Sequence, residues 1–320
     1  MKQLVILSGK GGTGKTSIAA SFAHLAHSDS VLAVLADADV DAANLELVLS
    51  PHVLEEHDFI GGKLAWIDPE KCEGCGLCEQ ICRFDAIAFH ADKYQVDPIA
   101  CDGCAACVHQ CPTRAIKMEP QLAGHWFRSE SHFGPLFHAA LRPAQENSGK
   151  LVTLVKQQAR LLAMDEKYPL IIVDGPPGIG CPVISAVSGA DMALIVTEPT
   201  VGGVHDMERA IQMTRHFNIP SAVCINKCDI FGEGAAQIKN FCLEQKIEVL
   251  GQIPFDPNVT EAMVYGEPVT ACRPASPASR EIKGLWQNLV SILLADQVGS
   301  AGFERRMNTE KETIRNEHNY

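Results

Sequence analysis

Residues 9–16 read GKGGTGKT, a pattern whose residue types and spacing suit the binding of phosphate groups. The pattern follows an apolar stretch, residues 3–8, and opens a helical stretch that begins near Gly14. Glycines let backbone N–H groups turn toward phosphates, and the N-terminus of the helix adds a positive end. We expect Lys15 to reach the β- and γ-phosphates and the Thr16 hydroxyl to ligate Mg²⁺. The predicted nucleotide contacts are Gly9, Gly11, Gly12, Thr13, Gly14, Lys15, Thr16 and Ser17. The alternative interpretation of this segment is a glycine-rich turn that binds no ligand.

Eight of the thirteen cysteines form two runs with the same C-x2-C-x2-C-x3-C spacing. Thiolates are soft donors that suit iron, and the short gaps let three sulfurs of one loop face one cluster. The spacing is that of bacterial two-cluster ferredoxins, in which the fourth cysteine of each run ligates the other cluster. The sequence therefore predicts two [4Fe-4S] clusters, the first held by Cys72, Cys75, Cys78 and Cys111 and the second by Cys101, Cys104, Cys107 and Cys82.

Other metal sites are alternatives to these clusters. Zinc competes for the two runs, but four consecutive ligands at this spacing, twice, exceed what a tetrahedral zinc site uses. Arg83 stands where the first run would usually carry proline, a departure that removes no ligand. Three histidines, His125, His132 and His138, offer another metal site, although such side chains more often face solvent or pack. We interpret most of the remaining cysteines as buried small apolar residues, with Cys181 as the candidate exception; they are Cys181, Cys224, Cys228, Cys242 and Cys272.

A second lysine in the phosphate-binding loop, Lys10, gives the segment KGGTGKT, which resembles the deviant Walker A motif of the MinD, ParA and Mrp ATPases. The resemblance covers nearly all of the chain outside the cysteine runs. In that family the early lysine reaches the nucleotide of the partner subunit. The resemblance thus implies catalytic roles for Lys10 and Lys15 and an ATP-dependent dimer, with a second copy or with a related ATPase. A solvated loop cation is the alternative for Lys10.

Acidic residues at two strand ends extend the resemblance. Asp37-Ala38-Asp39, followed by Asn44 and Leu45, is similar to the D-x-D…N-L switch of the family. The second acid of that switch orients the attacking water, so the resemblance assigns this catalytic role to Asp39. The run LIIVDGPPG places Asp174 at the end of an apolar strand, like a Walker B acid. Because Mg²⁺ prefers hard oxygen ligands, the predicted Mg²⁺ residues are Thr16, Asp37 and Asp174, although Asp37 alone is also explained as a strand-end cap.

Two further segments resemble the purine-binding parts of MinD. Asn226 and Lys227, in CINKCD, match the position that contacts adenine. Residues 253–269, which include Pro254 and Asp256, resemble the proline-rich turn that frames the base. Asn226, Lys227 and Asp229 also fit the N-K-x-D guanine signature of GTPases. ATP is the nucleotide that the resemblance implies, since the other motifs follow the MinD pattern.

The elements that must position these residues alternate between short apolar runs and helical stretches. This alternation predicts an α/β P-loop NTPase fold with a mostly parallel sheet and helices on both faces. Residues 61–120 interrupt it with short segments and an internal repeat, as expected of a small inserted α+β ferredoxin-like domain. We interpret residues 121–149 as an ordered loop or switch. The predicted divisions are ATPase residues 1–60 and 121–298, the insert at 61–120 and a polar tail at 299–320.

The net charge and the apolar content of the sequence bear on whether the protein binds nucleic acid or a membrane. The net charge of −12 argues against a general electrostatic grip on nucleic acid, which needs clustered cations. No apolar run is long enough to suggest a membrane span, and the N-terminus does not read as a leader, so we expect a cytoplasmic protein. The tail GFERRMNTEKETIRNEHNY has few large apolar residues, so we expect no stable membrane anchor.

The coexistence of the two site types leads to three hypotheses. The first is an ATPase whose nucleotide state gates electron transfer between an unidentified donor and acceptor. The second is an assembly or carrier factor that passes a cluster to an apo-protein target. Mrp-type carriers place a C-x-x-C pair in the second half of the chain, whereas Cys224 and Cys228 here are separated by three residues. The third is a positioning ATPase like MinD.

Overall fold

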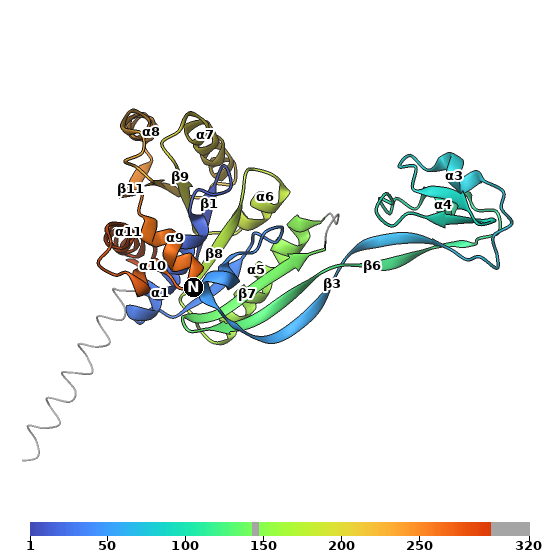
Figure 1. Cartoon of the computed structure of the whole chain (residues 1–320), viewed down its shortest axis with the longest axis horizontal. Helices are drawn as coiled ribbons and strands as arrows, with labels where there is room; N and C mark the ends of the chain where they lie inside the picture. Colours follow the sequence, from blue (N-terminus) through green and yellow to red (C-terminus); the bar gives the residue numbers. More distant parts are fainter. Residues whose placement is uncertain (143–146, 296–320) are drawn as a thin grey trace, which may run out of the picture.

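A nine-stranded sheet forms the centre of the computed structural model, which describes residues 1–142 and 147–295 (Figure 1). The strand order is β11-β10-β9-β1-β8-β2-β7-β6-β3. The pairs from β11 to β7 are parallel, and β6 and β3 add two antiparallel strands at one edge. The parallel strands are β1 (Lys2–Ser8), β2 (Ala33–Asp37), β7 (Gly134–Leu141), β8 (Leu170–Pro177), β9 (Met192–Thr197), β10 (Ser221–Asn226) and β11 (Glu248–Ile253). The predicted α/β fold with a mostly parallel sheet is confirmed.

Helices cover both faces of this sheet, which explains why its central strands are apolar throughout. Along β1, Leu4 and Ile6 belong to one hydrophobic cluster, whereas Val5 and Leu7 belong to another, because successive side chains point to opposite faces. Helices α1 and α11 pack on the first face, and α5 and α6 on the second. The helices of the ATPase part are α1 (Lys15–Ser28), α2 (Leu45–Leu49), α5 (Ser148–Asp165), α6 (Cys181–Val187), α7 (Val201–His216), α8 (Gly232–Glu244), α9 (Pro257–Val264), α10 (Val269–Cys272) and α11 (Pro277–Leu293). Within the described ranges no helix combines the length and the hydropathy needed to cross a membrane.

The prediction of a loop at residues 121–149 is wrong. The first part of this segment belongs to β6 (Ile116–Ser131), the next part is β7, and α5 begins at Ser148. Half of the side chains of β6 are only half-buried, so its sequence lacks the strict two-residue alternation that marks a strand with one buried face. The segment therefore supplies an edge of the sheet, and residues 143–146, within the same predicted loop, lie outside the described residues.

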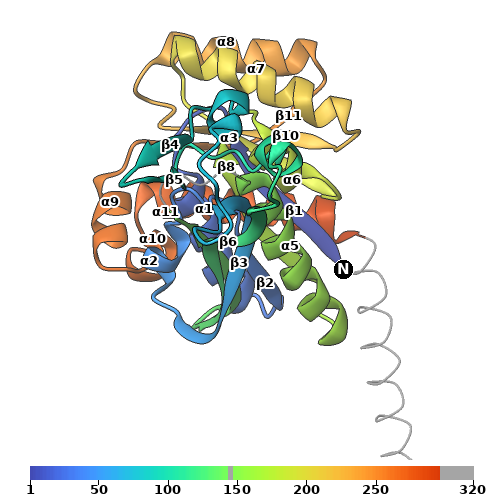
Figure 2. The same cartoon turned by 90° about the vertical axis from the view of Figure 1, so that its right-hand side faces the viewer.

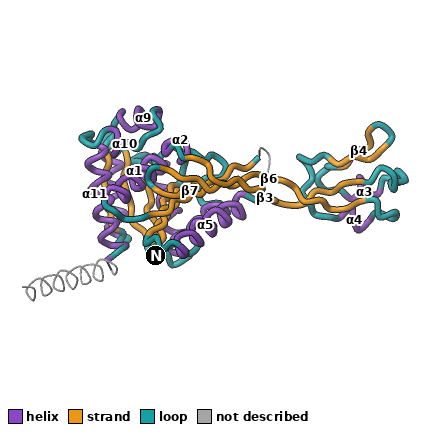
Figure 3. The backbone as a smooth tube through the Cα atoms, turned by 90° about the horizontal axis from the view of Figure 1, so that it is seen from below, coloured by secondary structure: helices purple, strands orange, loops and turns teal. Residues whose placement is uncertain are grey.

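A long two-stranded ribbon leaves this edge of the sheet (Figures 1 and 3). Strand β3 (His52–Ile67) pairs with β6 from one end to the other, between His52↔Glu130 and Ile67↔Ile116. Strand β7 accompanies β6 only from Gly124 to Ser131. Beyond that point residues 59–67 of β3 extend the ribbon by about 25 Å, at about 3.3 Å per residue. The predicted insert boundaries, 61 and 120, fall within β3 and β6.

A small module lies at the far end of the ribbon and holds both cysteine runs. It contains α3 (Leu77–Ile81), the hairpin β4 (Ile87–His90) and β5 (Lys93–Val96), and α4 (Ala106–Gln110). The module has its own hydrophobic cluster, which joins Ile87 to Ile67 and Ile116 at the ends of the ribbon. Figure 2, turned toward the module, shows α3 and the hairpin in front of the sheet. The predicted tail, residues 299–320, lies outside the described residues.

Candidate functional site

The phosphate-binding loop joins β1 to α1 as the motif requires. Gly12 and Gly14 have φ angles of +77° and +93°, which L-residues with a side chain rarely adopt. A Cβ at Gly14 would also lie 2.4 Å from Asn226 Nδ2, and a Cβ at Gly9 would lie 2.0 Å from that of Asp206. Glycine is therefore required at positions 9 and 14 for close packing, and the loop leads directly into the N-terminus of α1.

Lys15 is buried, and its side chain is hydrogen-bonded to a serine hydroxyl. Its side chain lies at the base of the loop, where Nζ donates a hydrogen bond of 2.8 Å to Ser8 Oγ. Burial lowers the pKa of Lys15, and the nearby Asp174, Asp39 and Asp37 oppose that shift. Its ammonium group is thus directed into the loop by a neutral partner, with three carboxylates near enough to favour the charged form.

Asp37 ends β2 and is paired in register with Asp174 of the neighbouring β8, and both are buried. The Asp37 carboxylate accepts hydrogen bonds from the backbone N–H groups of Asp39, Asn44 and Leu45, at 3.0, 3.1 and 3.0 Å. Burial and the proximity of Asp174 raise the pKa of Asp37 well above its usual range. These bonds hold residues 37–45, the predicted switch, in one conformation.

Asp174 has a buried carboxylate oxygen that could bind a cation. Its Oδ1 atom is buried and has no hydrogen-bond partner within the described part of the chain. An unpaired buried carboxylate oxygen is costly, and burial raises the pKa of Asp174. A divalent cation beside Thr16 and Asp174 would relieve this cost, so the residues present fit Mg²⁺.

A cavity of about 640 Å³ opens above the loop. Asp39 lines it; burial raises the pKa of Asp39, while Lys15 opposes that shift. The cavity combines backbone amides, a cation and apolar walls, as a site for a nucleotide requires. The predicted site residues along its wall are Gly11, Gly12, Gly14, Lys15, Thr16, Ser17, Asp39, Asn226, Lys227, Pro254 and Asp256.

At the predicted base-binding end, three polar side chains make hydrogen bonds within the protein. Asn226 Nδ2 donates to the Thr13 carbonyl at 2.8 Å and so ties β10 to the phosphate-binding loop. Asp256 caps α9 by accepting from the N–H of Asn258 and also accepts from that of Ala278. Asp229, the third member of the guanine-like signature, accepts from Phe255 N at 2.7 Å. The backbone and the rings of Pro254 and Phe255, which line the cavity, are the groups left to face a base at this end.

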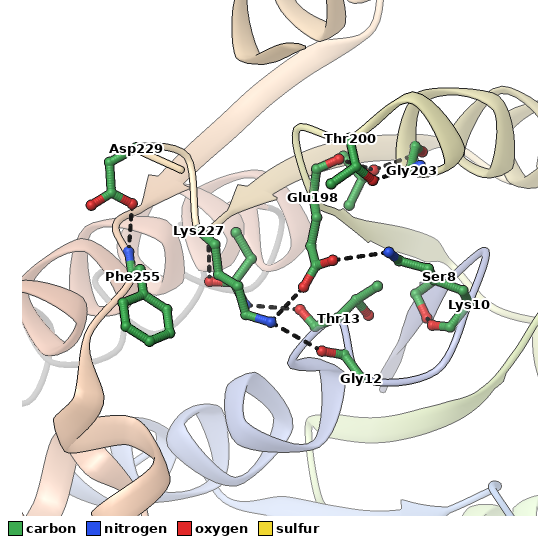
Figure 4. Close-up of polar contacts among 12 residues, drawn as sticks. Ser8, Lys10, Gly12, Thr13, Glu198, Thr200, Gly203, Lys227, Asp229 and Phe255 are labelled. Carbon is green, nitrogen blue, oxygen red and sulfur yellow. Dashed lines mark hydrogen bonds and ion pairs between the residues drawn. The ribbon is translucent and has the colours of Figure 1, made fainter. Parts of the chain in front are cut away.

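Sequence reasoning missed Glu198, which pairs with two predicted ATP contacts (Figure 4). Its carboxylate lies 3.1 Å from Lys10 Nζ and 2.5 Å from Lys227 Nζ. Burial alone would raise the pKa of Glu198, but hydrogen bonds from Lys227 and Lys10 hold it below its usual range. Glu198 directly follows β9, but nothing in the sequence pairs it with the two lysines.

Replacing Glu198 by glutamine is expected to tighten ATP binding by the single chain about two- to fivefold, because the freed Lys227, on the cavity wall, gains up to about 1 kcal/mol of attraction to the nucleotide. Isothermal titration at low and high salt measures this gain, which should shrink as salt rises. Glu208→Gln, in helix α7, is the matched control and should bind ATP like the wild type. Unchanged or weaker binding by Glu198→Gln alone would show that Glu198 does not compete with ATP for Lys227.

The two cysteine runs are equivalent in the structure as well as in the sequence. In each run the first and fourth cysteines are half-buried, the second is exposed and the third is buried. The N–H of Ala86 donates to Cys82 Sγ at 3.4 Å, and that of Ala115 donates to Cys111 Sγ at 3.3 Å. Such bonds stabilise thiolates, so the fourth cysteine of each run is prepared to be a ligand.

One small cavity tests the predicted exchange of the fourth cysteine between runs. It is lined by Cys82 of the first run together with Cys101, Cys104 and Cys107 of the second. These are the four ligands predicted for the second cluster, so the structure brings them together. In residues 1–142 and 147–295 no group of three or more His, Cys, Asp or Glu side chains is placed to hold one metal ion. A four-iron cluster differs from such a site in that each thiolate binds its own iron.

The remaining candidates are scattered. Cys224 and Cys242 are buried as predicted, Cys228 and Cys272 are half-buried, and Cys181 is exposed. The three histidines point to different neighbours: His125 to Glu56 and Asp58, His132 to His27, and His138 to Glu46 and Ser129. The structure thus does not bring these histidines together.

Comparison with known proteins agrees with this architecture. The family model for the CobQ/CobB/MinD/ParA nucleotide binding domain matches residues 4–269. An uncharacterized protein from Methanocaldococcus jannaschii is 33% identical over 291 residues, which cover 91% of this chain and 97% of the relative. An iron-sulfur cluster carrier protein from Pyrococcus horikoshii is 29% identical over 157 residues, which cover 44% of this chain and 52% of the carrier.

Solved structures show the same fold. The MinD cell division protein from Aquifex aeolicus superposes with a TM-score of 0.56 at 21% identity, covering 91% of this chain and 98% of that protein. MinD complexed with Mg-ADP from Pyrococcus horikoshii gives 0.55 at 18% identity, with 91% and 96% covered. With a family match over most of its length, the chain belongs to the CobQ/CobB/MinD/ParA family and has its nucleotide-binding ATPase fold.

Proposed function

We propose that this chain is an ATP-hydrolysing, ATP-dependently dimerising iron–sulfur protein in which the nucleotide state gates electron transfer through two [4Fe-4S] clusters. One observation carries the proposal: a continuous ribbon, β3 and β6, joins the cysteine module to the sheet edge beside the predicted switch. Strand β3 begins three residues after α2 ends, and α2 begins six residues after Asp39. A change at the nucleotide thus has a short covalent route to the module.

In the nucleotide pocket, Lys15 and the loop amides hold the phosphates, and Thr16 with Asp174 and Asp37 holds Mg²⁺. Asp39, which lines the cavity beside Lys15, orients the attacking water. The burial that raises its pKa is opposed by Lys15, which keeps Asp39 able to accept a hydrogen bond from that water. Magnesium, when bound, supplies charge neutralisation at the phosphates.

Dimerisation requires Lys10 to leave Glu198. In the single chain Lys10 is bound within its own subunit, with its side chain 41% exposed, so it is close to the surface that a partner would approach. A partner's nucleotide offers Lys10 a more highly charged anion than one carboxylate. The partner is a second copy or a related ATPase, and we expect neither nucleic acid nor a membrane anchor.

In the module, eight cysteines hold the clusters, which supply one-electron storage when bound. Cys75 and Cys104 are exposed at equivalent positions, so both predicted clusters have a ligand at the surface where a donor or acceptor can approach. The proposal places the protein in the cytoplasm, where thiols stay reduced.

The proposal is tested with anaerobically purified holo-protein. Reduced protein is mixed with a one-electron dye acceptor in the presence of ATP, ADP or no nucleotide, and the transfer rate is followed optically. We expect rates with ATP and ADP to differ by about fivefold or more, the lower range of typical coupling energies. Equal rates in the three states, with clusters and nucleotide both bound, would exclude gating.

Cluster delivery is the second candidate, because several relatives that match part of this chain are named iron-sulfur cluster carrier proteins. A carrier must release its cluster, whereas an electron carrier keeps it. Incubating the holo-protein with an apo-ferredoxin and a chelator separates the two functions. Transfer to the acceptor despite the chelator, accompanied by loss of iron from this chain, would support delivery and count against electron transfer as the main role.

A further inference from the structure

His138 lies buried between the predicted switch and the base of the ribbon. Its side chain is 3% exposed on β7. Nδ1 lies 2.8 Å from the Glu46 carboxylate of α2, and Nε2 lies 2.9 Å from Ser129 Oγ of β6. The ring also stacks on Phe127 of β6, with centroids 5.0 Å apart. One side chain thus connects the switch helix to a ribbon strand.

The protonation state of His138 fixes the direction of both hydrogen bonds. Burial lowers its pKa to about 4, so the ring is neutral near pH 7. The carboxylate of Glu46 can only accept, so Nδ1 carries the proton and donates to it. Nε2 then accepts from the Ser129 hydroxyl, which is itself fully buried. In the hydrogen-bonded series Ser129–His138–Glu46, each side chain therefore donates to the next.

The N-terminus of α2 is hydrogen-bonded to Asp37 of the predicted switch. Asp37 accepts from the N–H groups of Asn44 and Leu45, which begin the helix. Farther back in the switch, the Val40 carbonyl accepts from Leu141 N at the end of β7. Any movement of residues 37–45 on nucleotide binding changes the position of Glu46 relative to β7.

We infer that His138 is a positioning residue that transmits the state of the switch to the ribbon through its hydrogen bonds to Glu46 and Ser129. This inference rests on the proposed function, since it names the route by which nucleotide and module influence each other. The three side chains form a continuous path of two hydrogen bonds from α2 to β6, so the loss of either bond interrupts the path. The route complements the covalent passage from α2 into β3.

Hydrogen exchange on the ribbon tests this inference without requiring electron transfer. Amide exchange in residues 59–67 and 116–122 is compared with ADP and with a non-hydrolysable ATP analogue. The wild type should show a difference, and His138→Phe, which keeps the ring stack but loses both hydrogen bonds, should reduce that difference about five- to tenfold. His132→Phe, at the turn of the same hairpin, is the matched control and should behave like the wild type.

A second pair of variants guards against a folding defect at the buried site. Glu46 is 38% exposed, so Glu46→Ala should fold, and it should lose the nucleotide dependence of ribbon exchange. Glu46→Gln retains an oxygen that accepts from Nδ1 and should restore it. Full nucleotide dependence in His138→Phe and Glu46→Ala, or a wild-type ribbon that does not respond to nucleotide, would overturn the inference.

The electron-transfer assay keeps this result separate from the proposed function. If the wild type gates electron transfer and His138→Phe gates it equally, the positioning role fails while the proposed function stands. If the wild-type ribbon responds to nucleotide through His138 but transfer rates do not, the positioning role stands and gating fails.

Discussion

Replacement of Lys15 by alanine is expected to lower kcat for ATP hydrolysis about 10²- to 10³-fold, the typical loss when one buried group that stabilises transition-state charge is removed. Lys15 is buried at the base of the loop, and its contact with Ser8 Oγ leaves the positive charge available to phosphate. Single-turnover hydrolysis with Mg²⁺ and saturating ATP measures the chemical step. A variant that hydrolyses ATP at a rate near that of the wild type would contradict the assignment of this pocket.

Lys10→Ala is the informative control for Lys15→Ala. Lys10 is partly exposed and bound to Glu198, outside the buried part of the loop. Its loss should leave ATP binding by the single chain within about twofold, since exposed pairs contribute little, while ATP-dependent dimerisation is lost. Light scattering and titration on the same samples separate the two lysines. Identical defects in both variants would show that the loop has unfolded.

Replacement of Cys82 by serine is expected to remove one whole cluster, so that bound iron falls from about eight to about four atoms per chain. The cluster lost should be the one held by Cys101, Cys104 and Cys107, because Cys82 lines the same small cavity as these three. Iron and sulfide analysis with EPR of the reduced protein makes this measurement. Cys181→Ser, at an exposed cysteine outside both runs, is the matched control and should keep all of the iron.

The exchange of fourth ligands makes a sharper prediction about which variants resemble each other. Cys82→Ser and Cys101→Ser should leave the same EPR spectrum, that of the first cluster. Cys82→Ser and Cys72→Ser should leave different spectra. If Cys82→Ser instead matched Cys72→Ser, each run would serve its own cluster and the assignment would be wrong.

Local patterns made much of the site predictable. The phosphate-binding loop and the cysteine runs depend on residue types at fixed short spacings, so the chain alone brings their members together. The central strands were predictable because burial on both faces leaves continuous apolar runs. The acids Asp37, Asp39 and Asp174 were predicted from their resemblance to the switch and Walker B motifs of the family.

What could not be predicted depends on partners far apart in the chain. Glu198 is one acidic residue among many until β9 and β10 place it between Lys10 and Lys227. The segment at 121–149 was misinterpreted because β6 owes its extended form to pairing with β3 and β7 rather than to an alternating sequence. The sequence offered His138 only as one of three possible metal ligands. Its contacts with Glu46 and Ser129 lie on two other elements and leave no local pattern.

The central claim is that nucleotide and clusters influence each other within one chain. The most direct test is the affinity for ATP of anaerobic holo-protein, measured by titration with the clusters fully oxidised and fully reduced. We predict a difference of about fivefold or more, and by linkage a matching nucleotide-dependent shift in reduction potential, at about 59 mV per tenfold change summed over the two one-electron clusters. Equal affinities in the two redox states, with the full complement of iron present, would contradict the account.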